Sequence, residues 1–381
     1  MDLSMQIVKH VLVDEEKRDL GKNFLFSPLS LTTLLSMVAS GLKGDALEKM
    51  MSLLGLKSLA DIFTESSRAM SFSSSEKANG PVLFSSVNGA WLDHKYTLKP
   101  SFQHALKSIF NAHSSTLDFT NQPEDSIDEI NKWVENATKG LIKKSLSKDV
   151  FKVEETVLIL ANALYFKGSW HYPFFPPATK CDNFYTLDGD TVQVPYMNKN
   201  CRVFDYGSFE GFKILRMPYK CSSGKMKHMF AMYFFLPHEK DGLHSLLEQL
   251  STDSALLNLR FEFEEVRIRE LKIPKFKFKY NLGVSEIMEQ MGLRVNIKSD
   301  AEMLEALDAN SVIEDMKVCH TSFIEVNEHG TEAAAVTFSL VGGGAPPPTV
   351  FVADHPFVFM IREDSSETPI FIGTVVNPLL E

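Results

Sequence analysis

The sequence has few cysteines, no long apolar run and no apolar start. Cys181, Cys201, Cys221 and Cys319 fit neither a zinc-site spacing nor the density of a disulfide framework, so we expect free thiols in a reducing compartment. No apolar stretch approaches the roughly 18 residues of a membrane helix, and charged residues interrupt the first 20 positions. We therefore expect no membrane association and a cytoplasmic or nucleocytoplasmic location, which leaves later extracellular action open.

Basic residues are also in deficit. The formal net charge is −10, which argues against a nucleic-acid binder that neutralises phosphates. In the one basic stretch, residues 272–279, lysines alternate with apolar residues. This alternation is typical of a strand with a solvated lysine face.

Catalytic and metal-binding motifs are missing as well. His238 and His244 lack the i, i+4 spacing of a helical zinc site. The glycines at 342–344 have no following lysine, so they do not form a phosphate loop, and no Gly-x-Ser-x-Gly motif occurs. We therefore expect no catalytic residues, no metal and no cofactor, and we conclude that the protein is not an enzyme.

The chain has ample material for a core. Hydrophobic residues make up 44% of its 381 positions and charged residues 23%, which is ordinary for a globular protein. No linker, composition shift or internal repeat divides the sequence. We expect one α+β domain that spans residues 1–381.

The most informative segment runs from Thr331 to Pro348. Every second residue in its first part is small or uncharged: Thr331, Ala333, Ala335, Thr337, Ser339, Val341 and Gly343. Such alternation gives a strand one neutral face. Three glycines and three prolines follow, and they cannot lie inside a sheet. The pattern predicts a strand that could enter a sheet, tethered to an exposed tip; the alternative is a low-complexity surface loop.

Motifs elsewhere in the chain point to one family. They lie at residues 23–30 (Asn-Phe-Leu-Phe-Ser-Pro-Leu-Ser), 130–135, 161–170, 271–276 and 355–378. In this order, and together with the segment at 331–348, they closely resemble the serpin family over nearly the whole chain, and residues 351–357 look like its plant branch. The resemblance implies an α+β serpin fold, with helices around three sheets, a large central sheet, and a hinge and exposed reactive-centre loop at 328–350.

The resemblance also implies a function. A serpin is a monomeric, irreversible suicide-substrate inhibitor of serine or cysteine proteases. The protease forms an acyl-enzyme on the loop, and the freed strand inserts into the central sheet before hydrolysis finishes. The alternative is a serpin fold that no longer inhibits and serves as a binding or chaperone-like protein, which the glycine–proline tip motivates.

Three groups of residues carry over from the family by motif. The hinge would comprise Glu328, Gly330, Thr331, Glu332, Ala333, Ala334 and Ala335. The shutter, a hydrogen-bonded network beneath the strands that part, would comprise Ser27, Ser30, Asn162 and His320. The breach, at the top of the sheet, would comprise Trp170, Lys275 and Glu328, with an ion pair between the last two.

The family places the scissile bond after the seventeenth residue counted from the hinge glutamate. Counting from Glu328 gives the Gly344–Ala345 bond. No Lys or Arg occurs from residue 318 to residue 361, so the target endopeptidase should not be trypsin-like. We expect a protease with a small first pocket, or a papain-like enzyme that Leu340 would direct to the bond after Val341.

Overall fold

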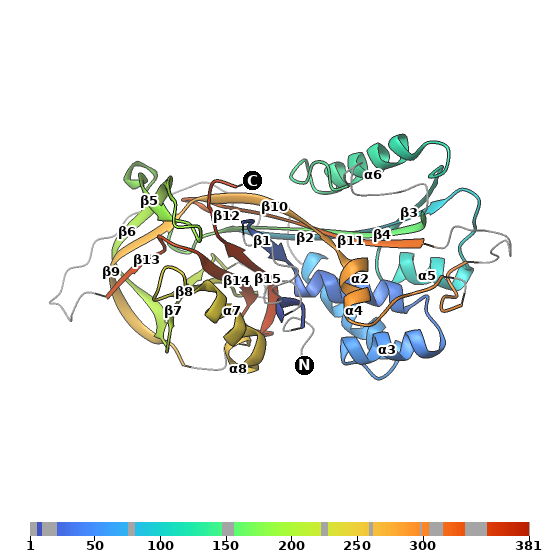
Figure 1. Ribbon diagram of the computed structural model, residues 1–381, viewed down its shortest axis with the longest axis horizontal. Helices are drawn as coiled ribbons and strands as arrows, with labels where there is room; N and C mark the ends of the chain where they lie inside the picture. The colour runs from blue at the N-terminus through green and yellow to red at the C-terminus, as the bar shows by residue number, and fades with distance from the viewer. Residues whose placement is uncertain are drawn as a thin grey trace.

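The computed structural model describes residues 6–9, 21–74, 81–146, 156–221, 228–258, 262–297, 299–304, 315–331 and 349–380. Two sheets organise these residues, with helices packed mainly at one end (Figure 1). None of the described helices is long and apolar enough to span a membrane. The Thr331–Pro348 prediction lies almost wholly outside the described residues.

A six-stranded sheet runs along the molecule in the order β10-β11-β4-β2-β3, and a short β12 also pairs with β4. The bounds are β10 Phe276–Gly283, β11 Asp315–Val326, β4 Thr156–Ser169, β2 Val82–Asp93, β3 His113–Leu117 and β12 Gly330–Thr331. β11 and β4, at the centre of the sheet, are parallel, as are β2 and β3 at one edge; the other neighbours are antiparallel.

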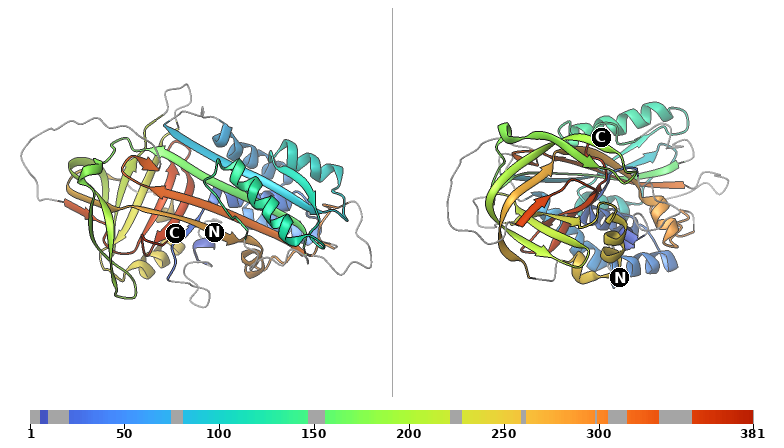
Figure 2. Two further views of the ribbon diagram at one scale, coloured as in Figure 1. Left: turned by 90° about the horizontal axis from the view of Figure 1, so that it is seen from above. Right: turned by 60° about the vertical axis from the view of Figure 1, so that its left-hand side comes forward.

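Both faces of this sheet are covered, which explains why β4 is apolar along nearly its whole length. Helix α6 (Pro123–Ala137) lies across one face (Figure 2, left), and its Ile130 packs in one cluster with Ile159 and Ala161. On the opposite face Leu158 and Leu160 join the largest core cluster. From Leu158 onward, odd-numbered residues of β4 therefore face α6 and even-numbered residues face the core, while Val157 also belongs to the core cluster.

The bounds of the remaining helices are α2 Pro28–Ala39, α3 Gly44–Leu54, α4 Leu59–Ser74, α5 Pro100–Ser108, α7 Leu243–Thr252, α8 Ser254–Leu257 and α9 Val284–Gln290. Among them, α2, α4, α5 and α9 pack against strands of this sheet, α3 packs on α2, and α7 packs against the second sheet with α8 beside it. Helix α2 is buried on nearly every side, as expected for a helix that is hydrophobic all round. It begins with Ser27 as N-cap, whose Oγ accepts a hydrogen bond from the Ser30 N–H.

The second sheet has nine strands in the order β1-β15-β14-β8-β7-β6-β9-β13, with β5 added on β6. Their bounds are β1 Phe24–Phe26, β15 Thr368–Val375, β14 Phe357–Glu363, β8 Phe230–Pro237, β7 Phe212–Pro218, β6 Thr191–Ser208, β9 Glu264–Pro274, β13 Thr349–Val352 and β5 Lys180–Tyr185. The mixture of helices and sheets is the α+β class expected from the sequence, with one difference in how the sheets are joined.

The sequence led us to expect three sheets. In the described residues, hydrogen bonds join two of them into the single nine-stranded sheet. The cause is the length of β6 and β9, which pair with each other almost from end to end. Along β6 the outward side chains change from even-numbered positions (Asn200) to odd-numbered positions (Val203). Along β9 they change in the same way, from Glu270 to Arg269. The two strands thus turn a corner and carry one sheet into the next.

The lysine-rich stretch is two strands rather than one. β9 ends at Pro274 and β10 begins at Phe276, so Lys275 lies between strands that belong to different sheets. Proline lacks the N–H that a central ladder needs, which accounts for the break.

Candidate functional site

The top of the six-stranded sheet contains a fork. β11 and β4 pair in parallel up to Phe323 and Tyr165. Beyond this point the two strands part, and β12 pairs with β4 instead, with Gly330 opposite Ser169. A tight turn closed by a bridge between Asn327 and Gly330 connects β11 to β12. The hinge thus leaves β11 and starts down between the two strands.

Gly330 is required at this place for a steric reason. Its φ is +144°, a conformation that residues with a side chain rarely adopt, and an added Cβ would lie 2.0 Å from the Gly168 carbonyl oxygen. The hinge residues Gly330 and Thr331 belong to β12. The other hinge residues named from the sequence, Glu332, Ala333, Ala334 and Ala335, lie outside the described residues, as does the Gly344–Ala345 bond.

The breach residues lie together just behind the fork. Lys275 Nζ is 2.9 Å from Glu328 Oε2, so the ion pair expected from the sequence is present. Thr179 Oγ1 also donates to the Glu328 carboxylate, at 2.7 Å. Burial disfavours ionisation of Glu328, but the hydrogen bonds from Thr179 and Lys275 outweigh it, so the pKa of Glu328 lies below its usual value. The carboxylate is therefore charged and anchored at neutral pH.

Trp170 fixes the same turn through its backbone and its ring. The indole N–H donates to the Asn327 carbonyl at 3.0 Å, and the Trp170 N–H donates to the His329 carbonyl at 2.9 Å. The ring is fully buried and stacks on Tyr219, with centroids 4.5 Å apart. The sequence did not identify Thr179 or Tyr219 as part of this cluster, and neither lies in a motif that points to it.

The shutter network lies lower in the sheet, around the fully buried His320. His320 Nδ1 is 3.1 Å from Asn162 Oδ1, while Nε2 accepts from the Ser27 N–H at 3.3 Å and lies 2.7 Å from Ser322 Oγ. Because the Ser27 N–H can only donate, Nε2 must be unprotonated and Nδ1 carries the hydrogen. Burial lowers the pKa of His320 to about 3.

Two predicted members do not join this network through their side chains, because Ser27 contributes only its backbone N–H while its Oγ caps α2. Ser30 Oγ is buried without a hydrogen-bond partner in the described part of the chain, and only its backbone N–H reaches Ser27. Position 30 lies in the first turn of α2. The expectation that Ser30 Oγ is paired there is wrong.

Three residues of the network were missed. Asn162 Nδ2 donates to Asn88 Oδ1 at 2.7 Å and to Ser86 Oγ at 2.9 Å, and Ser322 contacts His320. Ser86 and Asn88 are polar residues at spacing two in a largely apolar strand, so they lie on one face of it and could have been grouped. The network therefore ties α2, β2, β4 and β11 together beneath the fork.

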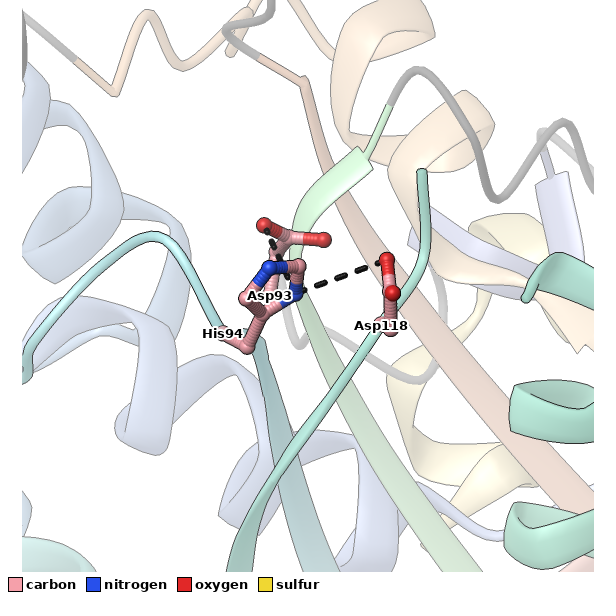
Figure 3. Close-up of side chains that lie close together, drawn as sticks. All are labelled: Asp93, His94 and Asp118. Carbon is pink, nitrogen blue, oxygen red and sulfur yellow. Dashed lines mark ion pairs between the residues drawn. The ribbon is translucent and has the colours of Figure 1, made fainter. Parts of the chain in front are cut away.

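A group that could hold a metal ion lies at the other end of the sheet (Figure 3). His94 Nδ1 is 3.9 Å from Asp93 Oδ1 and 3.4 Å from Asp118 Oδ1. The Asp93 oxygens already accept the N–H groups of Lys95 and Phe119, at 3.1 Å and 3.0 Å. These bonds close the turns after β2 and β3, and they account for the cluster without a cofactor.

Comparison with known proteins identifies relatives across the full length. The family described as "Serpin (serine protease inhibitor)" matches residues 1–378. Serpin-Z2B of Triticum aestivum is 38% identical over 366 residues, 94% of this chain and 90% of that protein. Serpin-Z10 of Arabidopsis thaliana is 35% identical over 382 residues, 99% of this chain and 96% of that protein. The solved structure of Arabidopsis AtSerpin1, titled as the native stressed conformation, superposes with a TM-score of 0.88 at 34% identity, covering 99% of this chain and 96% of that one.

Proposed function

This chain belongs to the serpin family, and we propose that it is an irreversible suicide-substrate inhibitor of serine or cysteine endopeptidases. Its plant relatives support protease inhibition in general. In the proposed mechanism a protease attacks the reactive loop and forms an acyl-enzyme. The freed strand then inserts between β4 and β11, carries the protease away and distorts its active site. The chain would act as a monomer with one domain.

The strand orientations around β12 support this mechanism most directly. β4 and β11 are parallel neighbours, and β12 is antiparallel to β4. A single strand placed between two parallel strands can be antiparallel to both, so insertion would convert one parallel pairing into two antiparallel ones. Antiparallel pairing is slightly more stable per residue. The inserted state therefore gains ladder hydrogen bonds and improves their geometry.

The register at β12 also suits the rest of the loop. Gly330 pairs with Ser169 and Thr331 with Gly168. Continued at the same register, the chain would bring Gly343 opposite Thr156, where β4 begins. The fourteen positions from Gly330 to Gly343 match the 14 residues of β4, a strand of about 46 Å.

The same register matches chemistry as well as length. Odd-numbered loop residues would lie opposite even-numbered residues of β4, which face the core. The neutral face that begins at Thr331 would therefore be the buried one, as the cost of an unpaired buried charge requires. Glu332, the one charged residue in the inserting segment, would lie opposite Lys167, where a cross-strand ion pair is favourable.

The target class follows from the loop sequence. The proposed reactive bond, Gly344–Ala345, offers no basic side chain to an acidic pocket. An elastase-type enzyme with a small first pocket could cleave there, whereas a papain-like enzyme directed by Leu340 would cleave after Val341. The later bond leaves a longer strand to insert, so we propose that the elastase-type protease is trapped more efficiently.

A gel screen tests the proposal. The protein is incubated with one protease of each class (elastase-type, papain-like, chymotrypsin-like and trypsin), and SDS-stable complexes are sought. We expect a complex with an elastase-type enzyme, a released fragment that begins at Ala345, and a large gain in melting temperature after the loop is nicked. Loop cleavage by the elastase-type or papain-like enzyme without complex or stability gain would instead indicate the non-inhibitory alternative, a binding or chaperone-like protein.

A further inference from the structure

An open, polar cleft of about 650 Å³ lies on the outer face of β5, β6 and β9. Phe175 stands at its lip and is 45% exposed. On β9 the floor residues alternate with Leu271 and Ile273, which are buried in the core. The polar side chains of the floor include Lys180, Asp182, Asn200, Glu270 and Lys272.

One edge of this cleft is tied to the start of the reactive loop. Phe174, next to Phe175, donates its N–H to the Glu328 carbonyl at 2.8 Å. Thr179, which follows the short helix Pro176–Ala178 at the lip, donates to the Glu328 carboxylate. The lip therefore adjoins the turn from which β12 and the hinge emerge.

The opposite edge is tied to the end of the loop. β13 pairs in parallel with β9, with Val350 opposite Glu270 and Val352 opposite Lys272. Val350 is 39% exposed on the same outer face. The loop thus leaves the fold at one edge of the cleft and rejoins it at the other.

The size of a protease brings this face within its reach. Gly344 is five residues before Thr349, so the proposed reactive bond lies within about 17 Å of the start of β13. A protease of about 220 residues has a radius of gyration near 17 Å. The three strands of the cleft lie within about 15 Å of β13, at roughly 4.8 Å per strand. A protease seated on the bond would extend over them.

We propose that this cleft is a contact surface for the target endopeptidase, used while the loop is intact and abandoned when the acyl-enzyme is carried down the sheet. The inference rests on the function proposed above and adds a second determinant of which proteases are attacked. The cleft would act before acylation, so it would set the association rate and leave the stoichiometry and lifetime of the final complex unchanged.

The chemistry of the cleft indicates what it recognises. Lys272 Nζ lies 3.1 Å from Asp182 and 3.2 Å from Glu270. With Lys180, the floor carries two positive and two negative groups, so its net charge is zero. An exposed aromatic ring beside neutralised charges and the amide of Asn200 fits a protease surface loop with one apolar side chain and several hydrogen-bonding groups. Recognition should depend on shape and contact, with little dependence on salt.

Phe175→Ala is the direct test, with pancreatic elastase as the probe and Leu379→Ala as the matched control. Leu379 is 52% exposed, lies near the C-terminus and does not line the cleft. We expect the second-order rate constant of trapping to fall about 5-fold for Phe175→Ala, as for a contact residue of moderate importance. Melting temperature, stoichiometry and complex lifetime should match the parent, as should all values for Leu379→Ala.

A second variant, Asn200→Arg, adds bulk to an exposed position of the floor and should also slow trapping. Unchanged rates in both cleft variants, with trapping intact, would overturn the contact surface and leave the proposed function standing. If the parent cleaves without trapping, the proposed function fails, and the kcat/KM of loop cleavage then tests the surface. A fall confined to the cleft variants supports contact, and equal values overturn it.

Discussion

His320 should make this protein sensitive to mild acid. Its Nε2 accepts hydrogen bonds from the Ser27 N–H and the Ser322 hydroxyl, and its Nδ1–H donates to Asn162. Protonation would place a hydrogen on Nε2, facing the Ser27 N–H, at a site with no exposure to water. Protonation of His320 is therefore unfavourable in the native state, whereas the unfolded chain binds the proton near the ordinary histidine pKa.

The size of the effect follows from the two pKa values. The folded pKa of His320 is about 3 and its ordinary value is 6.5. Because the folded value is depressed, the neutral form stabilises the fold fully above pH 6.5, and this stability is lost as pH falls from 6.5 toward 3. pH 5 lies about 1.5 units below the pKa of this histidine in the unfolded state. Proton binding therefore lowers the free energy of unfolding by about 2 kcal/mol at pH 5.

Urea unfolding followed by tryptophan fluorescence at pH 7.5 and pH 5.0 measures the effect, with His320→Gln as the comparison. The substitution itself will lower stability, so the quantity of interest is the loss between the two pH values. We expect the parent to lose about 2 kcal/mol more than the variant over this interval. All other titrating groups are common to both proteins. Equal losses would show that His320 is not the acid-sensitive group and that its deduced protonation state is incorrect.

Three further predictions concern the hinge. Thr331→Arg should turn trapping into plain cleavage, because residue 331 pairs with Gly168 where the loop enters the sheet and a guanidinium there would lie on the core face; undiminished complex on a gel would contradict the insertion route. Lys167→Glu should slow insertion about 5-fold by placing like charges opposite one another at Glu332, at a cost of about 1 kcal/mol, and raise the number of inhibitors consumed per protease, with Lys167→Gln as an intermediate. Gly330→Ala should lower both the melting temperature and the trapping yield, because its Cβ would meet the Gly168 carbonyl oxygen at 2.0 Å; a variant as stable as the parent would refute the steric argument.

Much of the site could be found from the sequence because the motifs lie in long, regular elements. Lys275 and Glu328 are 53 positions apart, yet each lies next to a strand of the same sheet, and the ion pair forms as expected. His320 and Asn162 were also grouped correctly, since they are direct partners in the parallel pairing of β11 and β4.

The parts that could not be found depend on cross-strand register and side-chain direction. Ser86 and Asn88 enter the shutter only because β2 pairs antiparallel with β4 at Asn88 and Asn162, and register cannot be read from one strand alone. The prediction for Ser30 was wrong for a related reason, because a sequence motif places Ser30 in α2 but does not give the direction of its hydroxyl. The joining of two sheets through β6 and β9 likewise depends on where long strands turn, which alternation does not reveal.

The attachment of β13 has a consequence for how long the protein stays active without meeting a protease. In an uncut chain the loop is held at Thr331 in one sheet and at Thr349 in the other. If Gly343 moved to the foot of β4, some 46 Å down the sheet, the six residues to Thr349 could reach back only about 21 Å. β13 would have to peel away, and Phe351, which is fully buried, would have to come out with it. The strength with which this four-residue strand is held in its sheet would therefore set how long the uncut protein could still trap a protease.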